Sequence, residues 1–567
     1  MTRTAGAGAD LACRALEAAG VRHVFGLPGT QNVPLFEALR RSRLRVIQAT
    51  HELAATMMAC GYGRTTGLPG VVAAIQGPGL AWAVAGLLEA RDDSTPLLLL
   101  TGTPASSPGR TFQLQAWDQA TSLGPVVKRV LRAERPEAVP GAVASALTIA
   151  CSGEPGPVVL ELAPEALTDT AEVELDTWSG PPLEPEPGAL ADLAARLAAS
   201  RRPLLLAGQG VRSAAALREL AERIGAPVAT TLSARGSLPE DHPLSFGVDL
   251  GLAVDAVSRI AEKADLILAL GWKGTHNGTG GFRLHLPADR LVHVDASPEV
   301  LGANYPAALG VVADAALVLE ALVAEPRSTR EGPGWAAAEL AAAREAARQA
   351  VDAEPRFAGL DVADASGFFA ALRKALPRDA ILVTDSGLHQ ALARRHFAVH
   401  APGGFLAPSD FQSMGFGLPA GIGASLAAPD RRVVVLTGDG GFAMVGAELV
   451  TAVREGLPLT VLVFNDGHLG LIRRQQLREY GHAHAVAAGP MDYGAFAQAV
   501  GAGYRLLEGP ARVGLEAALA VPGPTLVEVV LGDSGAMDAL RARGAARAAA
   551  RRALPKGFVG WLRRRLG

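Results

Sequence analysis

Two apolar runs that each end in a glycine-rich turn constrain the fold of this chain most. The run at 433–436 ends in Gly-Asp-Gly, the run at 459–464 ends in Asn-Asp-Gly, and a helical pattern at 443–455 lies between them. Because a helix that connects two parallel strands returns the chain to the same edge of the sheet, the two turns should meet there. The pattern predicts a parallel α/β sheet that brings Asp439 and Asp466 together.

Two oxygen side chains beside glycine-rich backbone suit a magnesium ion. Mg²⁺ prefers oxygen ligands and readily shares its coordination shell with phosphate groups. The turn at 438–441 also opens the helix, whose free N–H groups attract a diphosphate. The alternative is a pair of ordinary β-turns, since both tripeptides are common turn formers. The pattern alone leaves both interpretations open.

The Gly-Asp-Gly turn and the Asn-Asp pair resemble, in residue type and spacing, the thiamine diphosphate motif of the thiamine-dependent decarboxylases and carboligases. In that family the aspartate, the second asparagine and a backbone carbonyl two residues further on hold the metal. The resemblance implies that Asp439, Asp466 and the carbonyl of His468 hold Mg²⁺ here. Asp466 departs from the family's asparagine but keeps an oxygen ligand. The resemblance also implies cofactor contacts at Gly438, Gly440, Gly441, Leu469, Gly470 and Leu471.

Length and composition indicate a folded protein of several domains. The chain has 567 residues, of which 49% are hydrophobic and 19% are charged, and about 150 residues per domain suggests three or four domains. A net charge of −3 gives no overall field for binding nucleic acid. The three cysteines show neither metal spacing nor a disulfide framework. Without a membrane-length apolar run or a signal-peptide core, the chain is expected to be cytoplasmic and to bind no membrane.

Helical patterns that alternate with short apolar runs predict three doubly wound, parallel-sheet α/β domains, at 1–175, 189–325 and 355–535. The resemblance implies that they are, in order, a pyrimidine-binding, a central and a diphosphate-binding domain. The last segment, 536–567, carries nine Arg or Lys residues and one Asp. Such a basic tail indicates a solvated helix or a lid over the active site.

Glu52 is expected to open a helix directly after a strand of the first domain. A carboxylate at a helix N-terminus is ordinarily a favourable partner of the helix dipole. The segment from His51-Glu52 to Gly61-Tyr62-Gly63-Arg64 is, however, similar to the family segment that carries its activating glutamate. The resemblance implies that Glu52 hydrogen-bonds to the pyrimidine ring of the cofactor and so helps the cofactor to lose a proton.

Three turns of the first domain should lie at the carboxyl ends of its strands, where open α/β sheets bind ligands. One of them carries Pro28 and Gly29, the next carries Glu52, and the third carries Gly77. The resemblance implies cofactor contacts at these turns. Gln115 aligns with a family glutamine on a loop that reaches into the partner subunit's active site, and is therefore a catalytic candidate.

Further candidates come from the first and third domains. Gln31 stands where benzaldehyde lyase has a histidine, and His389 follows an apolar strand, where it is either a catalytic residue or a cap of that strand. The glycine-rich stretch at 412–424 is ordinarily a tightly packed helix. The resemblance implies instead that Met414 props the cofactor into a V shape and that the carbonyl of Gln412 accepts a hydrogen bond from its amino group.

The resemblance leaves the reaction open, as a lyase or a transferase. The alternatives are acetolactate synthesis from pyruvate, decarboxylation of another 2-oxo acid, and cleavage or formation of a 2-hydroxy ketone. Acetolactate synthases have a Phe where Leu114 stands and a Trp where Gln475 stands, so we expect a substrate larger or more polar than pyruvate. A non-catalytic or regulatory relative that kept the fold is disfavoured, because Glu52, Met414 and both aspartates occur together.

The resemblance also bears on the central domain and on assembly. Acetolactate synthases bind FAD in the middle domain, while some relatives bind ADP or no nucleotide there. Trp272 and Lys273 depart from the Gly-Ala-Arg-Phe pattern of acetolactate synthases, which disfavours FAD. The family forms dimers or tetramers that act on small 2-oxo acids and aldehydes. Each active site lies between the first domain of one subunit and the third domain of another.

Overall fold

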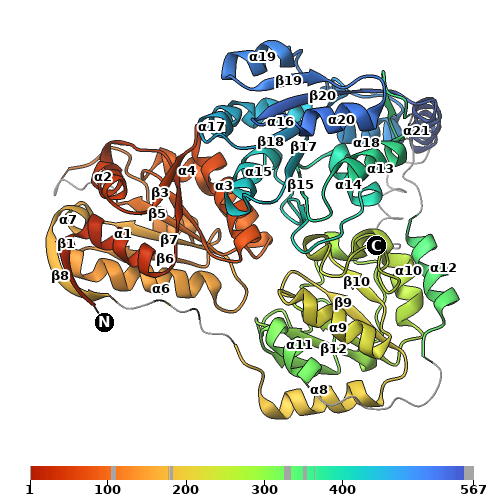
Figure 1. Cartoon of the computed structure of the whole chain (residues 1–567), viewed down its shortest axis with the longest axis horizontal. Coiled ribbons are helices and arrows are strands. Elements are labelled where there is room, and N and C mark those ends of the chain that lie inside the picture. Colours follow the sequence, from red (N-terminus) through yellow and green to blue (C-terminus); the bar gives the residue numbers. More distant parts are fainter. Residues whose placement is uncertain are drawn as a thin grey trace.

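Three α/β domains make up the chain, and each is built on a mainly parallel sheet (Figure 1). The computed structural model describes residues 2–103, 110–175, 178, 180, 183–324, 334–348, 354–362 and 364–553. In Figure 1 the first domain lies at the left in red and orange, the central domain below in yellow and green, and the third domain above in teal and blue. The predicted fold class is confirmed.

The first domain contains a parallel sheet with the strand order β3-β2-β4-β5-β7-β6. Its central strands are buried along their whole length, because helices cover both faces of a parallel sheet. The strands are β2 (His23–Gly26), β3 (Arg45–Gln48), β4 (Gly70–Ala73), β5 (Leu97–Gly102), β6 (Arg129–Ala133) and β7 (Pro157–Leu162), with β1 (Thr2–Ala7) and β8 (Thr170–Leu175) as a separate antiparallel pair. The helices are α1 (Gly8–Ala18), α2 (Val33–Arg41), α3 (Glu52–Thr66), α4 (Pro78–Asp92), α5 (Gln119–Leu123), α6 (Val139–Cys151) and α7 (Pro164–Thr168).

The central domain repeats this design on a parallel sheet with the order β10-β9-β11-β12-β13. Its strands are β9 (Pro203–Ala207), β10 (Val228–Thr230), β11 (Leu266–Leu270), β12 (Leu291–Asp295) and β13 (Leu309–Val312). Its helices are α8 (Pro187–Ala199), α9 (Ala214–Ile224), α10 (Leu250–Ala261) and α11 (Ala315–Ala324), and the connector to the third domain contains α12 (Ala337–Ala347).

The third domain has the strand order β14-β20-β18-β17-β15-β16, with β19 also paired to β20, and only β14 runs antiparallel among the described strands of this sheet. The strands are β14 (Arg356–Phe357), β15 (Ile381–Thr384), β16 (Phe405–Leu406), β17 (Val433–Gly438), β18 (Leu459–Asn465), β19 (Gly503–Leu506) and β20 (Thr525–Gly532). The helices are α13 (Ala365–Ala375), α14 (Leu388–His396), α15 (Gly417–Ala427), α16 (Asp439–Val445), α17 (Leu449–Arg454), α18 (Gly470–Tyr480), α19 (Tyr493–Val500), α20 (Ala511–Leu519) and α21 (Ala536–Ala553).

One helix differs from the sequence-based expectation, and the basic tail is described in part. The helix expected at 443–455 begins at Asp439, as α16, and continues as α17 after a 3-10 turn at Gly446–Glu448. The glycine-rich stretch that suggested a turn is therefore already the first turn of the helix. The basic tail forms α21, which packs against α18, while residues 554–567 lie outside the described residues. No described helix is long and apolar enough to cross a membrane.

The first and third domains share one hydrophobic core, because α3 packs directly on α15. A Cβ added at Gly61 of α3 would lie 2.1 Å from the carbonyl oxygen of Ala420, and one added at Gly423 of α15 would lie 1.9 Å from that of Met58. The two helices therefore touch backbone to backbone, which only glycine permits at these positions. This close packing fixes the orientation of the two domains that carry the candidate site residues.

Candidate active site

The two turns that end β17 and β18 lie side by side, as predicted. The strands are parallel neighbours, with Gly438 opposite Phe464. Asp439 then opens α16, and Asp466 follows β18 directly. Oxygen Oδ2 of Asp439 is buried and has no hydrogen-bond partner among the described residues. Burial, and then the charge of Asp466, raise the pKa of Asp439 to about 6, so this pair of carboxyl groups favours a bound cation.

A cation at this pair would need further oxygen ligands. Within the described ranges, no group of three or more His, Cys, Asp or Glu side chains could hold a metal ion. The imidazole Nδ1 of His468 lies 2.6 Å from the carbonyl oxygen of Asp466, and the ligand predicted at this residue is its own backbone carbonyl. Two carboxylates, a backbone carbonyl and ligand phosphate oxygens form a donor set that Mg²⁺ accepts. The residues present therefore fit the metal, while the assignment of Asp439, Asp466 and His468 as ligands stays a prediction.

The glycines of this turn allow neighbouring residues to approach its backbone. A Cβ added at Gly440 would lie 2.6 Å from Cδ2 of Leu469 and 3.4 Å from Cε of Met414. A Cβ added at Gly470 would lie 2.2 Å from Oδ2 of Asp466. The structure therefore brings Met414 and Leu469 together at Gly440, beside the carboxylate pair. Leu471 follows on α18 and is partly exposed.

His389 is buried beside the same turn. Its Nδ1 would lie 3.2 Å from a Cβ added at Gly438, and its Nε2 is buried without a partner in the part of the chain described. Burial lowers the pKa of His389 to about 4, so the ring is neutral at pH 7. His389 therefore lies beside the Gly438 turn, while its catalytic role stays a prediction.

Residues 412–415 form a strained segment that is tied down at both ends. Gln412 has a φ of +62°, which non-glycine residues rarely adopt, and its side-chain amide donates to the carbonyls of residues 408 and 409. The N–H of Gly415 donates to the buried carboxylate of Asp385, which also accepts from Thr437 Oγ1. Sequence reasoning missed Asp385, although the Thr-Asp-Ser-Gly that follows β15 is a local signal for such a turn.

In the first domain the turn from β4 to α4 organises the candidate residues. A Cβ added at Gly79 would lie 2.9 Å from Oε1 of Glu52, and one added at Gly77 would lie 2.9 Å from Cβ of Gln115. A Cβ added at Gly29, which follows Pro28, would lie 2.4 Å from Cγ2 of Ile75 in the same turn. The predicted residues around Glu52 therefore converge on one turn.

Glu52 is not the cap of its helix. His51 takes that role, because its Nδ1 accepts a hydrogen bond of 3.1 Å from the N–H of Leu53. The carboxylate of Glu52 instead reaches the backbone of Gly79 on the neighbouring helix α4. Glu52 nevertheless lies in the first turn of α3, so a favourable interaction with the helix dipole stays open beside the predicted activating role.

Three glutamine side chains gather at the carboxyl ends of β2, β4 and β5. Nε2 of Gln31 donates to Oε1 of Gln115 at 2.7 Å, and Oε1 of Gln31 is buried without a partner among the described residues. Gln76 is 1% exposed, and neither its Oε1 nor its Nε2 has a partner there. Its Oε1 would lie 2.6 Å from a Cβ added at Gly102. The turn that carries Gln76 and Gly77 was predicted to lie at the ligand-binding edge of the sheet, but sequence reasoning gave Gln76 itself no role.

The candidate residues thus form two groups within one chain. The first comprises Gly29, Gln31, Glu52, Gly77 and Gln115, and the second comprises His389, Met414, Asp439, Gly440, Asp466 and Leu469. Among the described residues, no hydrogen bond or ion pair joins a member of one group to a member of the other. An arrangement in which two subunits complete each site stays a prediction.

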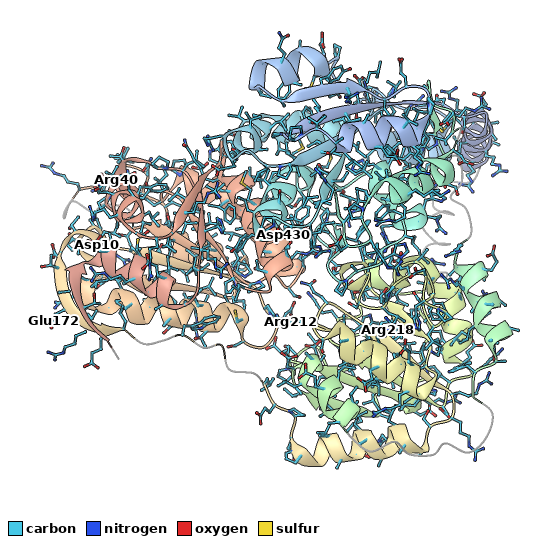
Figure 2. The ribbon with its side chains drawn as sticks, in the orientation of Figure 1. Asp10, Arg40, Glu172, Arg212, Arg218 and Asp430 are labelled. Atoms are coloured by element: carbon cyan, nitrogen blue, oxygen red, sulfur yellow. The ribbon has the colours of Figure 1, made fainter. Side chains whose placement is uncertain are left out.

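A cavity of about 790 Å³ lies where the three domains meet. Arg212, which Figure 2 labels where the central domain faces the first domain, contributes to its lining. Lys273, at the turn expected to face a nucleotide, donates to the carbonyl of Asp92 at 2.9 Å and lies 2.6 Å from Oε1 of Glu154. Burial raises the pKa of Asp295 on the same wall to about 6. The ammonium group of Lys273 is therefore already paired with groups of the first domain.

Comparison with known proteins places this geometry in a family. The thiamine pyrophosphate enzyme models match residues 7–122 with the N-terminal TPP binding domain, 190–322 with the central domain, and 385–529 with the C-terminal TPP binding domain. The acetolactate synthase isozyme 1 large subunit of Escherichia coli is 33% identical over 93% of this chain and 94% of that protein.

Two further relatives carry different names. A probable acetolactate synthase large subunit of Methanocaldococcus jannaschii is 32% identical over 84% of this chain and 82% of that protein. A probable 2-ketoarginine decarboxylase of Pseudomonas aeruginosa is 36% identical over 81% of this chain and 82% of that protein. With the three domains in order and similarity along nearly the whole chain, this protein belongs to the thiamine pyrophosphate (thiamine diphosphate) enzyme family.

Proposed function

We propose that this chain is a thiamine diphosphate- and Mg²⁺-dependent enzyme that cleaves or forms the carbon–carbon bond beside the carbonyl of a 2-oxo acid or a 2-hydroxy ketone. Its substrate carries a larger or more polar group than the methyl group of pyruvate. The observation that carries this proposal is the group of glutamine side chains with unpartnered buried amide atoms next to the Glu52 turn.

The two groups of candidate residues would have different roles in binding the metal and the cofactor. Asp439, Asp466 and the carbonyl of His468 would hold Mg²⁺, and Met414 and Leu469 would pack against the cofactor at Gly440. Glu52 would hold a proton at the pyrimidine ring. The bound cofactor supplies an electron sink beside the substrate carbonyl. The unpartnered Oδ2 of buried Asp439 supports this assignment, because a buried oxygen without a partner is costly.

The buried side-chain amides of the glutamines explain the proposed preference for a polar substrate. A buried polar atom without a partner costs about 1–3 kcal/mol, and both amide atoms of Gln76 are in this position. Glutamine does not titrate, so Gln31 and Gln76 would bind substrate instead of transferring protons. A site that hydrogen-bonds its substrate rejects an analogue without the polar group far more strongly than an apolar wall rejects one methylene.

Other observations support the same substrate class. Leu114 is exposed, and neither residue 114 nor residue 475 is aromatic. One relative is named as a decarboxylase of 2-ketoarginine, which is a 2-oxo acid with a polar side chain. A second candidate is acetolactate synthesis from pyruvate, which the names of the other two relatives favour.

We also propose that catalysis does not need FAD and that two subunits complete each site. Lys273 would have to leave Glu154 and the Asp92 carbonyl to pair with a bound diphosphate. Assembly is supported by apolar side chains that lie exposed near both groups: Trp82 on α4 and Met444 on α16 are 59% and 58% exposed.

The test is a substrate panel on the purified protein loaded with thiamine diphosphate and Mg²⁺. Products from pyruvate, from 2-oxo acids with amide or guanidinium tails, and from aldehyde acceptors are identified by mass spectrometry. The polar 2-oxo acids should turn over at least tenfold faster than pyruvate, and Gln76→Leu should remove this preference without changing cofactor affinity. Rapid conversion of pyruvate to acetolactate, with bound stoichiometric FAD and no effect of Gln76→Leu, would establish the second candidate instead.

A further inference from the structure

Two buried glutamates hold backbone N–H groups across the boundary between the first and third domains. Glu89, on α4 of the first domain, accepts a hydrogen bond of 2.9 Å from the N–H of Ser413 in the third domain. Glu448, in the 3-10 turn after α16, accepts from both the N–H and the hydroxyl of Thr50 in the first domain, at 2.9 and 2.6 Å. Both glutamates are 1% exposed. Each domain thus extends one carboxyl group into the other.

Both donors of these bonds are neighbours of candidate site residues. Ser413 lies between Gln412, with its φ of +62°, and Met414, whose Cε approaches Gly440. Thr50 precedes His51, which caps α3, and Glu52, whose carboxylate reaches Gly79. Glu89 therefore acts on the third-domain group, and Glu448 acts on the first-domain group.

The segment 412–415 needs its bond because its backbone is not held by a helix or strand. Residues 412–415 belong to no helix or strand, and Gln412 would relax from the left-handed region if the segment were free. The bond from Glu89 fixes Ser413, and the bond from Asp385 fixes Gly415, so Met414 is held from both sides. Glu448 is itself fixed, since its Oε2 accepts from Thr451 Oγ1 at 3.0 Å.

Stability alone does not account for a carboxyl group at residue 89. The neighbouring cation, Arg64, pairs with Asp93 at 3.0 Å, and Glu89 is buried beside that pair. Burial, and then the charge of Asp93, raise the pKa of Glu89 to about 8, so the side chain is neutral at pH 7. A carboxyl group buried next to Asp93 is unfavourable, and the raised pKa of Glu89 expresses that cost. Glu89 therefore supplies a hydrogen-bond acceptor at a fixed position for the N–H of Ser413.

We propose that Glu89 and Glu448 are reciprocal positioning residues, through which each domain sets the backbone of the other domain's cofactor-contacting segment. Glu89 places Met414 through Ser413, and Glu448 places Glu52 through Thr50. The inference rests on the proposed function, because it takes Met414 and Glu52 as cofactor contacts. It concerns hydrogen bonds within one chain and does not depend on which subunits complete a site.

The test compares leucine and glutamine at each position. Leucine has nearly the same size but no acceptor, whereas glutamine keeps an acceptor oxygen. The dissociation constant for thiamine diphosphate in Mg²⁺ is measured by calorimetry, and exchange of the cofactor's C2 proton into deuterated solvent is measured at saturating cofactor. Glu89→Leu should raise the dissociation constant at least tenfold, while Glu89→Gln should stay within threefold of the parent protein.

Glu448 should give the opposite pattern. Glu448→Leu should slow C2-proton exchange at least tenfold with the dissociation constant within threefold, and Glu448→Gln should restore the exchange rate. Glu240→Gln is the control for a general disturbance of a domain boundary, because Glu240 is buried, pairs with Arg235 and accepts the N–H of Val399 away from both groups. It should lower the melting temperature and leave both measurements unchanged.

The outcomes separate this inference from the proposed function. A parent protein that binds no thiamine diphosphate in Mg²⁺ would overturn the proposed function. A parent protein that binds it, together with leucine variants that change neither measurement or a Glu240→Gln that changes both, would overturn the positioning role alone. If Glu89→Leu does not fold, Glu89→Asp decides, because its carboxyl is one methylene shorter and should raise the dissociation constant at least threefold; an unchanged value would refute the role.

Discussion

Replacing Gly79 by alanine should disturb catalysis through Glu52, although Glu52 itself is unchanged. Gly79 lies in the first turn of α4, and the added Cβ would lie 2.9 Å from Oε1 of Glu52 and 2.8 Å from Cγ1 of Ile75. An ordinary non-bonded contact is about 3.5 Å, so the carboxylate has to retreat by roughly half an ångström. Ile75 closes the other side, so the helix cannot shift away freely.

The expected loss follows from the tolerance of catalytic geometry. Groups that act on a bound molecule have to be held within about 0.5 Å of their productive position, and a misplacement of about 1 Å can cost roughly a hundredfold in rate. A displacement of half that size should therefore slow C2-proton exchange about tenfold, which corresponds to about 1.4 kcal/mol. Overpacking should also lower the free energy of unfolding by about 1–3 kcal/mol.

The assay is exchange of the cofactor's C2 proton with solvent deuterium at saturating thiamine diphosphate and Mg²⁺. Gly141→Ala, in α6, is the matched control, because a Cβ added there meets nothing within 4 Å. This control should leave the exchange rate unchanged and stabilise the helix slightly. In a Glu52→Gln background, Gly79→Ala should cause no further loss, since both changes act through one carboxyl group. An unchanged rate in the single variant, or an equal loss in both backgrounds, would refute the reasoning.

Three further outcomes are expected. Glu52→Gln should bind thiamine diphosphate yet lose most turnover, and a kcat near that of the parent protein at saturating cofactor would exclude the activating role. Asp439→Ala should weaken cofactor binding in Mg²⁺ at least a hundredfold by calorimetry, because it removes a ligand of the bridging metal; unchanged affinity would contradict that placement. Burial and Asp93 raise the pKa of Glu89 to about 8 from its usual 4.5, so the stability gained by holding its proton is fully present below pH 4.5 and is lost as the pH rises through 8. Glu89→Gln should flatten this loss in urea unfolding curves measured from pH 5 to 9, with Arg64 and Asp93 unchanged; an unaltered slope would count against the assignment.

The part of the fold and the site that sequence could predict is the part set by local rules. Parallel βαβ connectivity dictates that the turns after β17 and β18 meet, and the structure places Asp439 and Asp466 there. The same rule places the turns at Gly29 and Gly77 at one edge of the first sheet. Their role toward metal and cofactor is still a prediction, because it depends on bound groups.

The residues that sequence reasoning missed act through distant partners. Glu89 lies 324 residues from Ser413, and Glu448 lies 398 residues from Thr50. Each glutamate stands among ordinary helix-forming residues, so no local pattern distinguishes it from a solvent-exposed one. The close packing of α3 on α15 joins the two domains between which these pairs form, and that packing depends on the glycines at 61 and 423.

Helix α4 connects the two groups of candidate residues within the chain. Gly79, which limits the place of the Glu52 carboxylate, and Glu89, which holds Ser413, stand ten residues apart on one uninterrupted helix, or about 15 Å along its axis. The helix is continuous between these two positions, so it connects them over this short distance. Any change that shifts α4 should therefore displace both Gly79 and Glu89, which contact one group each. The shared core of the first and third domains includes α4, and it therefore also holds this helix in the position that both segments require.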